Sequence, residues 1–296
     1  MNNLNEIITK DGSISLKSEF YNESFHSHLG ALKEAQTKFI NPALIDRFRG
    51  KSLSVLDICF GLGYNSALLF KNIKRQSSLL KWYGLEIDKR PLKHALNSEL
   101  FRSLWDKEII DILHSLSLKS LFSDENYSCK LLWGDAREKI FKIPKNINFD
   151  LIFLDGFSPQ KCPEIWTIEF LSQVIKKLSP EGSLLTYSSS AAVRKTFLEL
   201  KLKIFNIKPN IKTYKSWSNG TLARKNCNNY EFEENPYIEN LSMMQKEHLF
   251  TKSSIPYRDP KGINKSEDIL KTRKEEQTIS KLKDTNLWRK KWEITN

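Results

Sequence analysis

The sequence predicts an α/β protein with a doubly wound, mostly parallel sheet of seven strands. Three observations predict this class: buried apolar segments alternate with helical ones, a glycine turn follows the first strand, and acidic residues follow the next strands. Strands that alternate with helices form parallel sheets covered on both faces. At 296 residues the chain is long enough for a core domain with extensions. We expect an N-terminal extension at 1–50 that contributes to the active-site cleft, a core domain at 51–230 and a C-terminal basic helical extension at 231–296.

The elements are expected in a regular order along the chain. Residues 29–48 have apolar side chains at helical spacing, interrupted near Pro42. Buried strands are expected at 54–59, 81–88, 129–133, 150–155, 182–188, 204–208 and 221–225. Helical segments are expected between them, at 65–75, from the second strand to 121, at 163–178 and at 191–202.

The pattern of alternation ends after Asn226. The stretch 266–291 is helical in pattern and highly charged, and it leads to Trp288 and Trp292. Residues spaced i, i+4 share one face of a helix. We expect these two rings to dock onto the core, and the alternative is a disordered or partner-binding tail.

The charge balance favours a polyanionic partner. The chain has 47 Lys and Arg against 35 Asp and Glu, which gives a net charge of +12, and nucleic acid is one partner that such a charge attracts. A lysine-rich composition without such a partner gives the same number. The segment 193–225 has nine basic residues and one acidic residue, with Tyr214 and Trp217 among them. It is typical of RNA contact, or of a solvated helix face. Phosphate contacts are expected from Arg194, Lys195 and Lys215.

Several other classes of protein are disfavoured. The four cysteines are far apart and form no C-x-x-C pair, which argues against a zinc site or a disulfide framework and fits a reducing cytoplasm. Residues 1–11 lack the apolar core of a signal peptide, and no apolar run approaches the ~20 residues that span a bilayer. His26 and His28 lack further ligands at metal spacing. We therefore expect a soluble cytoplasmic protein without a metal, and the sequence leaves its oligomeric state open, with a monomer favoured.

The first two strand ends indicate a nucleoside ligand. Asp57 lies in the first strand, and Gly61 and Gly63 follow it and let the backbone approach a ligand closely. The third glycine of a dinucleotide fingerprint is missing. Glu86 ends the second strand and is placed to accept hydrogen bonds from both hydroxyls of a ribose, in NAD or in S-adenosylmethionine (SAM) alike.

The next two strand ends favour SAM and an amine. Asp135 and Ala136 follow the third strand, where an acid can accept from an adenine amino group. Asp155, Phe157 and Pro159 follow the fourth strand, where an amine-methylating enzyme would hold its target nitrogen. An alkylammonium has no lone pair, so a carboxylate has to orient it and accept a proton. We assign that role to Asp155.

At this point the sequence resembles a known family. The succession of Asp57–Gly63, Glu86, Gly134-Asp135-Ala136 and Asp155–Pro159 looks like a class I SAM methyltransferase, which has a Rossmann-like fold. The run from Phe149 to Trp166 is more specific and resembles the methyltransferase half of the MnmC family of tRNA-modifying enzymes. So do two N-terminal motifs, Thr9-Lys-Asp-Gly-Ser13 and His26-Ser-His-Leu-Gly30-Ala-Leu-Lys-Glu34-Ala. The resemblance covers about residues 9–200 and fades near 215–225, where the family usually has a denser basic cluster.

The resemblance implies methylation of 5-aminomethyluridine, or its 2-thio form, at the tRNA wobble position. It implies SAM as cofactor and tRNA as partner. The FAD-dependent half of the bifunctional members is not expected here, because the chain is too short for it. Gly61 and Gly63 are expected to border the methionine part of SAM, Glu86 the ribose, Asp135 the adenine, and Glu34 the cofactor amino group. Phe157 is expected to pack against the base or the adenine, and Pro159 to shape the loop.

Three alternatives remain at the level of sequence. A polyamine-type aminopropyltransferase uses the same sheet but should have a more acidic cleft than the basic segment at 193–225 suggests. An NAD-dependent dehydrogenase is disfavoured by Ser66 in place of the third glycine. A non-catalytic RNA-binding module would have no need of the four strand-end acids.

Overall fold

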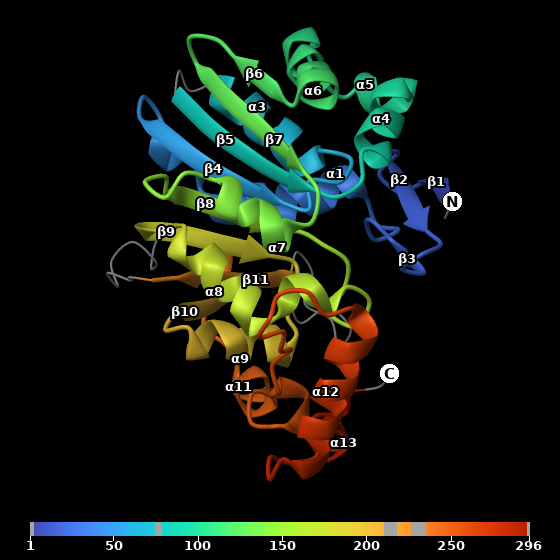
Figure 1. The fold of residues 1–296 in the computed structure, drawn as a ribbon, viewed down its shortest axis with the longest axis vertical. Helices are drawn as coiled ribbons and strands as arrows, with labels where there is room; N and C mark the ends of the chain where they lie inside the picture. Colours follow the sequence, from blue (N-terminus) through green and yellow to red (C-terminus); the bar gives the residue numbers. More distant parts are fainter. Residues whose placement is uncertain (1–2, 75–78, 210–217, 226–234, 295–296) are drawn as a thin grey trace. The chain divides into compact units, whose positions relative to one another are not determined.

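The computed structural model describes residues 3–74, 79–209, 218–225 and 235–294 (Figure 1). It divides into two compact units, Met1–Phe157 and Ser158–Asn296. This division differs from the three parts expected from the sequence, because residues 1–50 lie in the same unit as the first strands of the core.

The first unit contains a sheet in the order β8-β4-β5-β7-β6. Its strands are β4 (Ser52–Ile58), β5 (Leu79–Glu86), β6 (Leu121–Ser123), β7 (Tyr127–Trp133) and β8 (Phe149–Leu154). The pairs β4–β5, β5–β7 and β4–β8 are parallel, and β6 is antiparallel to β7. The chain therefore moves outward from β4 through β5 to β7 and then returns to the other side of β4 as β8. Ligands of open α/β sheets bind where the order reverses, which here is between β4 and β8.

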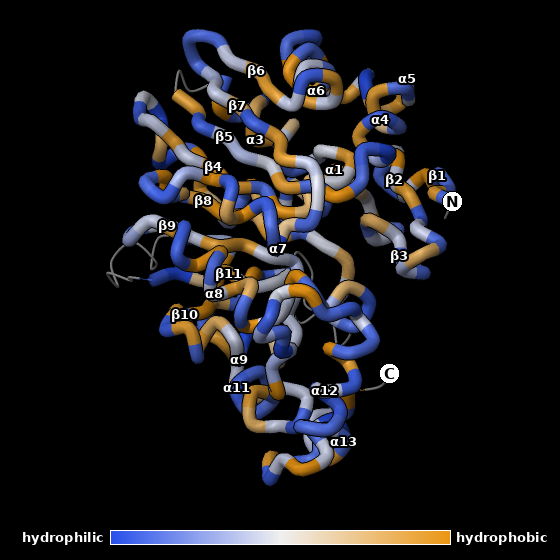
Figure 2. The backbone as a smooth tube through the Cα atoms, viewed as in Figure 1, coloured by the Kyte–Doolittle hydropathy of each residue, from blue (hydrophilic) through white to orange (hydrophobic). Residues whose placement is uncertain are grey.

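The middle strands form the core of this sheet. Hydrophobic residues run along β4 and β8 (Figure 2), and Leu56 and Ile152, which pair across them, are fully buried. Strands covered on both faces need such continuous apolar runs. The helical elements that follow β4 in this unit are α3 (Tyr64–Lys74), α4 (Arg90–Asn97), α5 (Glu99–Arg102), α6 (Lys107–Lys119), α7 (Ala136–Lys139) and the 3-10 turn η3 (Ile140–Lys142). Helix α6 packs against α3 and α4.

The first 50 residues form a small antiparallel sheet followed by short helices. The sheet has the order β1-β2-β3. These elements are β1 (Leu4–Ile8), β2 (Ile14–Ser18), β3 (Glu23–Ser24), α1 (Ala31–Glu34), the π-helix η1 (Ala35–Ile40), α2 (Asn41–Ala43) and the 3-10 turn η2 (Ile45–Phe48). The expected interruption near Pro42 is wrong, because the helical path passes through Pro42 and ends at Leu44, which has φ 50°. Pro42 is the second residue of α2 and follows directly on the π-helix η1, so it supplies no backbone N–H to the preceding turn.

The two N-terminal motifs of the sequence meet at the start of α1. Ser13 Oγ accepts the amide of Ala31 (3.0 Å), and Asp11 Oδ2 accepts the amide of Lys33 (2.9 Å). These are free amides of a helix N-terminus, which side-chain oxygens commonly satisfy. Gly30 has φ 146°, and a Cβ there would lie 2.0 Å from Asp11 Oδ2 and 2.8 Å from Asp11 Cβ. Only glycine fits at this position while Asp11 caps α1.

The second unit contains strands in the order β12-β10-β11-β9, paired antiparallel. Its elements are the 3-10 turn η4 (Pro163–Trp166), α8 (Ile168–Lys176), β9 (Leu178–Thr186), α9 (Ala191–Glu199), β10 (Lys203–Ile207), β11 (Gly220–Arg224), β12 (Ile238–Glu239), α11 (Met243–His248), the 3-10 turn η5 (Lys252–Ser254), α12 (Ser266–Ile279) and α13 (Thr285–Lys291). The single helix expected at 163–178 is divided, because Thr167 is extended and caps α8 by accepting the amide of Phe170.

The expected α/β class is confirmed. All seven expected strands are present, as β4, β5, β7, β8, β9, β10 and β11. The structure adds β6 and β12, two short strands that carry no long apolar run.

The C-terminal tryptophans dock within the second unit. The Trp288 ring stacks on His248 with centroids 3.9 Å apart, and its Nε1 donates to the carbonyl of Met244 (3.0 Å). Trp292 Nε1 donates to Glu247 (2.9 Å). Both rings therefore hold α13 against α11. Across the described ranges, no helix has the length and apolarity needed to cross a membrane.

Candidate active site

The segments that follow four parallel strands lie at one edge of the first unit's sheet. The strand register pairs Ile58 with both Leu85 and Leu154, and it pairs Glu86 with Trp133. Backbone hydrogen bonds continue beyond the strand ends, from Asp155 N to Ile58 O (3.1 Å) and from Gly134 N to Glu86 O (2.8 Å). The segments that follow β4, β5, β7 and β8 are therefore neighbours, as the alternating pattern of the sequence predicts.

The turn after β4 depends on glycine. Cys59, Gly61 and Gly63 have φ values of 65°, 59° and 94°, a region that disfavours residues with a Cβ. A Cβ at Gly63 would lie 2.8 Å from Cζ of Phe60. The turn leads directly into α3, whose first residues present free amides at the same sheet edge.

Glu86 holds this turn against the end of β5. Its Oε2 accepts the amide of Gly61 (2.8 Å) and its Oε1 accepts the amide of Asp88 (2.8 Å). Burial raises the pKa of Glu86, although backbone amides at Asp88, Gly61 and Ile87 act in the opposite direction. Glu86 as a residue is 7% exposed, so its carboxylate is a fixed hydrogen-bond acceptor next to the turn after β4. Its contact with a ribose stays a prediction.

Asp57 lies beneath the same turn and is fully buried. Its Oδ2 accepts from Ser66 Oγ (2.6 Å), which in turn accepts from Trp82 Nε1 (2.8 Å). Its Oδ1 is buried and has no hydrogen-bond partner within the part of the chain that the structure describes. Burial raises the pKa of Asp57 to about 7, and the charges of Asp155 and Glu86 act in the same direction. A fully buried residue of this kind is not accessible to a ligand in this structure, so the cofactor contact expected of Asp57 stays a prediction.

Asp135 has a local partner. It caps α7 by accepting the amide of Arg137 (2.9 Å), and its Oδ2 lies 2.7 Å from Arg137 Nη2. Ala136, the first residue of α7, is buried at the same turn. The adenine contact expected of Asp135 remains a prediction, and in this structure the carboxylate is occupied by Arg137.

Asp155 directly follows β8, next to the point where the strand order reverses. It is half-buried, and its Oδ2 accepts from Asn65 Nδ2 (2.7 Å) in the first turn of α3. Burial raises the pKa of Asp155 to about 7, and the Glu34 charge adds to this, whereas Asn65 and Lys38 act to lower it. A carboxyl group poised near neutrality can accept a proton at physiological pH.

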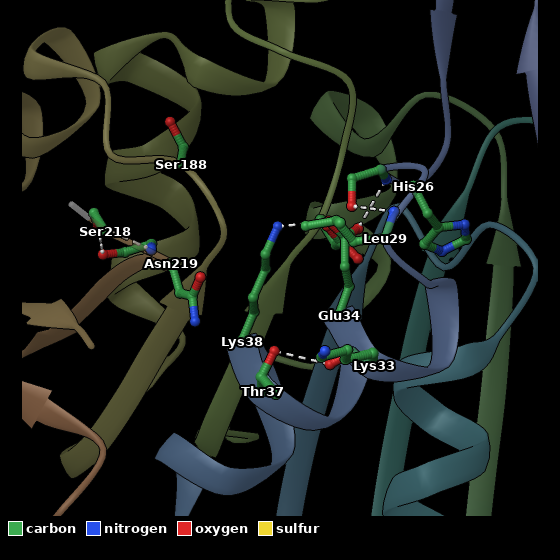
Figure 3. Close-up of polar contacts among 12 residues, drawn as sticks. His26, Leu29, Lys33, Glu34, Thr37, Lys38, Ser188, Ser218 and Asn219 are labelled. Carbon is green, nitrogen blue, oxygen red and sulfur yellow. Dashed lines mark hydrogen bonds and ion pairs between the residues drawn. The ribbon is translucent and has the colours of Figure 1, made fainter. Parts of the chain in front are cut away.

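The charges near Asp155 come from the N-terminal helices. Lys38 Nζ lies 2.7 Å from Glu34 Oε1, and Glu34 Oε2 accepts the amide of Ser27 (3.2 Å) (Figure 3). Burial acts to raise the pKa of Glu34, but the charge and hydrogen bond of Lys38, the hydrogen bond from Ser27 and the charge of His26 together lower it. Glu34 is thus ionised beside Asp155, and its expected contact with the cofactor amino group stays a prediction.

Phe157 lies in an aromatic cluster. Its ring stacks on Tyr21 with centroids 4.4 Å apart and meets Phe25 edge-on at 4.9 Å. Pro159, two residues further on, is buried and belongs to the second unit, next to the turn in which Cys162 N donates to Ser158 O (2.9 Å). The catalytic roles expected of Phe157 and Pro159 are not tested by these contacts.

The prediction that Arg194 contacts phosphate is wrong. Arg194 is 1% exposed in the second unit, and its guanidinium donates to Thr221, Asn206, Ser218 and the carbonyl of Gly220. The guanidinium donors are therefore used within the protein, by residues in and next to β10 and β11. Lys195 is half-buried on α9 and remains a candidate for phosphate contact. Lys215 lies outside the described residues.

Sequence reasoning missed Asn65, Lys38, Tyr21 and Phe25. Asn65 carried one signal, since it is the second residue after Gly63 and therefore opens the helix that points at the site. The other three come from the first 50 residues and had no local signal. His26, considered for a metal, instead contacts Ser15 Oγ through Nδ1 (2.9 Å) and the Tyr64 ring. Over the described ranges, no three His, Cys, Asp or Glu side chains are grouped as metal ligands.

Comparisons with known proteins agree with this geometry. Residues 99–219 match a family described as S-adenosyl-L-methionine-dependent methyltransferase. An uncharacterized protein of Methanocaldococcus jannaschii is 29% identical over 283 residues, which cover 93% of this chain and 72% of that protein. The crystal structure of MnmC2 from Aquifex aeolicus superposes with a TM-score of 0.78 at 27% identity, covering 94% of this chain and 86% of that one.

A bifunctional relative is matched over a smaller part. The tRNA 5-methylaminomethyl-2-thiouridine biosynthesis bifunctional protein MnmC of Paraburkholderia phytofirmans is 25% identical over 188 residues, 59% of this chain and 28% of that protein. The chain thus spans less than a third of that relative's length. The family match sets aside the dehydrogenase and the non-catalytic module, and it makes SAM the cofactor. The chain is an S-adenosyl-L-methionine-dependent methyltransferase related to the MnmC tRNA-modification enzymes.

Proposed function

We propose that this enzyme methylates the primary amine of 5-aminomethyluridine, or of its 2-thio form, at the wobble position of tRNA. The observation that carries the proposal is Asp155, a half-buried carboxyl group at the end of β8 whose pKa is about 7. It suits an amine substrate, because a carboxylate attracts an alkylammonium and can accept the proton that frees the nitrogen lone pair. The product named for the MnmC relative is a methylated amine of this kind.

The residues around the turn after β4 fit SAM. Gly61 and Gly63 allow the tight turn after β4, and we assign the methionine part of SAM to this turn. We assign the ribose hydroxyls to Glu86, which accepts the amide of Gly61 in the same turn. SAM supplies an electrophilic methyl carbon on a sulfonium: the amine lone pair forms the new N–C bond, and the electrons of the S–C bond stay on sulfur.

Asp155 prepares the amine for this transfer. The substrate reaches the site as an ammonium, and its positive charge is attracted to the ionised carboxylate. One ammonium proton passes to Asp155, which frees the lone pair, and that proton leaves to solvent later in the cycle. Asn65 fixes one carboxylate oxygen through a 2.7 Å hydrogen bond, so the geometry of the acceptor is set before the substrate binds.

The substrate is expected to be a tRNA because of charge as well as kinship. The net charge of +12 attracts a polyanion, and Lys195 remains available for a phosphate. We assign the first 50 residues to the cleft, since Glu34 and Lys38 act on the pKa of Asp155 from that segment.

The rate should depend on pH through Asp155. Below a pH of about 7 the carboxyl is protonated and cannot accept a proton, so kcat/KM should rise as the pH increases through that value. The Asn65→Ala variant loses a hydrogen bond that favours the ionised form, and the rising limb should move to higher pH. The dependence of kcat/KM on pH is measured by the transfer of labelled methyl to tRNA, at pH values below and above the pKa of Asp155.

A matched control is available on the same helix. Asn72 donates to the carbonyl of Leu68 (2.8 Å) away from the strand ends, and Asn72→Ala should leave the limb where it is. A limb that stays in place in Asn65→Ala would show that a group other than Asp155 controls the rate.

The reaction itself is tested with hypomodified tRNA. Purified protein is incubated with SAM and tRNA from cells that lack this methylation, and the digested nucleosides are analysed by mass spectrometry. We expect one added methyl on aminomethyluridine, and none when the tRNA already carries it. Methyl on another nucleoside, or no methyl at all, would overturn the proposed substrate, and a parallel reaction with decarboxylated SAM tests for aminopropyl transfer.

A further inference from the structure

The turn between β2 and β3 carries aromatic side chains to the segment after β8. Asn22 is in the left-handed region at φ 47°, and its amide donates to the carbonyl of Glu19 (3.3 Å), which closes the turn. Asparagine tolerates this conformation better than most residues. The turn presents Phe20 and Tyr21 as neighbours, with ring centroids 4.8 Å apart and planes at 87°.

The rings of Phe157, Tyr21 and Phe20 contact one another in succession, and Phe20 is the most exposed of the three. Phe157 is half-buried and has one face covered by Tyr21, which is also half-buried. Phe20, the outermost ring, is 66% exposed. A large exposed aromatic side chain contributes little to a core, and its ring is accessible from solvent.

Hydrogen bonds and packing hold the β2–β3 hairpin that carries Phe20 and Tyr21. Phe25 N donates to the carbonyl of Leu16 (2.8 Å), and Tyr64 Oη at the start of α3 donates to the carbonyl of Ile14 (2.9 Å). A Cβ at Gly61 would lie 3.5 Å from the Phe25 ring, so the hairpin rests on the turn after β4. The rings are therefore positioned before any substrate arrives, which lowers the entropy lost on binding.

We propose that Tyr21 and Phe20 form the stacking surface for the pyrimidine ring that carries the target amine. This inference rests on the proposed function and names the residues that hold the base. The amine of the substrate is one methylene away from the ring, and Asp155 is two residues from Phe157, so an amine at Asp155 brings its ring to this cluster. Unpaired bases bind proteins by stacking on aromatic side chains. Because Tyr21 covers one face of Phe157, Phe157 supports the surface from below.

The kinetic test uses the full chain with hypomodified tRNA. Loss of one stacking ring weakens base binding by about 10-fold or more, so Phe20→Ala and Tyr21→Ala should raise KM for tRNA by that factor and change kcat less. Tyr21→Phe keeps the ring and should retain the wild-type KM. SAM affinity, measured by calorimetry, should be unchanged in all three and also reports that each variant is folded. Phe250→Ala is the control, since Phe250 is 61% exposed in the second unit.

A binding test separates this inference from the proposed reaction. An anticodon stem-loop with the fluorescent pyrimidine pyrrolocytosine at the wobble position is titrated with each protein, and stacking quenches its emission. We expect quenching by the wild type, Tyr21→Phe and Phe250→Ala, and weaker quenching by Phe20→Ala and Tyr21→Ala. Equal quenching by all five proteins, or by none, would overturn the stacking surface. Quenching that depends on Tyr21 would uphold it even where the wild type transfers no methyl to the expected nucleoside.

Discussion

Replacing Asp155 with asparagine is expected to lower kcat for methyl transfer by about 100- to 10,000-fold, the range that removal of a general base produces. Asparagine preserves the size of the side chain and can still meet Asn65, but it accepts no proton and does not attract an ammonium. We assign SAM to the other strand ends, so its affinity should be retained. Single-turnover transfer to tRNA gives the rate, and calorimetry gives the SAM affinity.

The same variant should be more stable than the wild type above neutral pH. The pKa of Asp155 in the fold is about 7, above its ordinary value of 3.8. The folded state therefore holds a proton that the unfolded chain has already released, and the stability of the wild type falls as the pH rises from about 4 to about 7. The asparagine side chain of the variant has no such charge, so the Tm advantage of Asp155→Asn should be larger under mildly alkaline than under mildly acidic conditions.

The control for this pair of measurements is at the other end of β8. Asp150 Oδ2 accepts the amide of Ser54 (2.9 Å) far from the strand ends that form the site. Asp150→Asn should keep full activity. A fully active Asp155→Asn protein would remove Asp155 from the reaction and leave only the SAM site.

Replacing Glu86 with alanine is expected to weaken SAM binding by about 100-fold, which corresponds to the loss of two hydrogen bonds to a charged group. Glu86 orders the turn by accepting the amide of Gly61, and in the proposed SAM site it also accepts from the ribose. The change is measured by calorimetry with SAM and with S-adenosylhomocysteine, which should lose affinity equally because the two share the ribose.

An exposed acid provides the comparison for Glu86. Glu99 begins α5 in the same unit and is exposed, so Glu99→Ala should bind SAM as the wild type does. Unchanged SAM affinity in Glu86→Ala would move the ribose site elsewhere. Glu86→Gln should fall between wild type and alanine, because its amide retains one acceptor oxygen.

Seven strands of the sheet could be predicted from sequence because each of them carries its own signal, which the short β6 and β12 lack. β4 and β8 are mainly apolar and buried and have an acid close to their carboxyl ends, and parallel strands bring such ends together without further information. Glu86 and Asp155 could be placed at the site on this basis alone.

The rest of the site depends on contacts between distant segments, which no local pattern reveals. Tyr21 meets Phe157 from 136 positions away, and nothing in the residues around either one indicates the other. For Arg194 a local pattern was present but misleading. Its place in a basic segment suggested RNA contact, whereas the side chain is buried and donates to Ser218 and to the carbonyl of Gly220. The amount of positive charge in a segment does not say which of its members face solvent.

The cap on α1 also constrains how this sequence can vary over time. Asp11 can hold the amide of Lys33 only while residue 30 has no side chain. A lineage that replaces Gly30 therefore has to give up Asp11 as well, together with the cap. Since Glu34 and Lys38 follow on the same helical path, that exchange would disturb the charges beside Asp155. The two short N-terminal motifs should accordingly be inherited together or lost together.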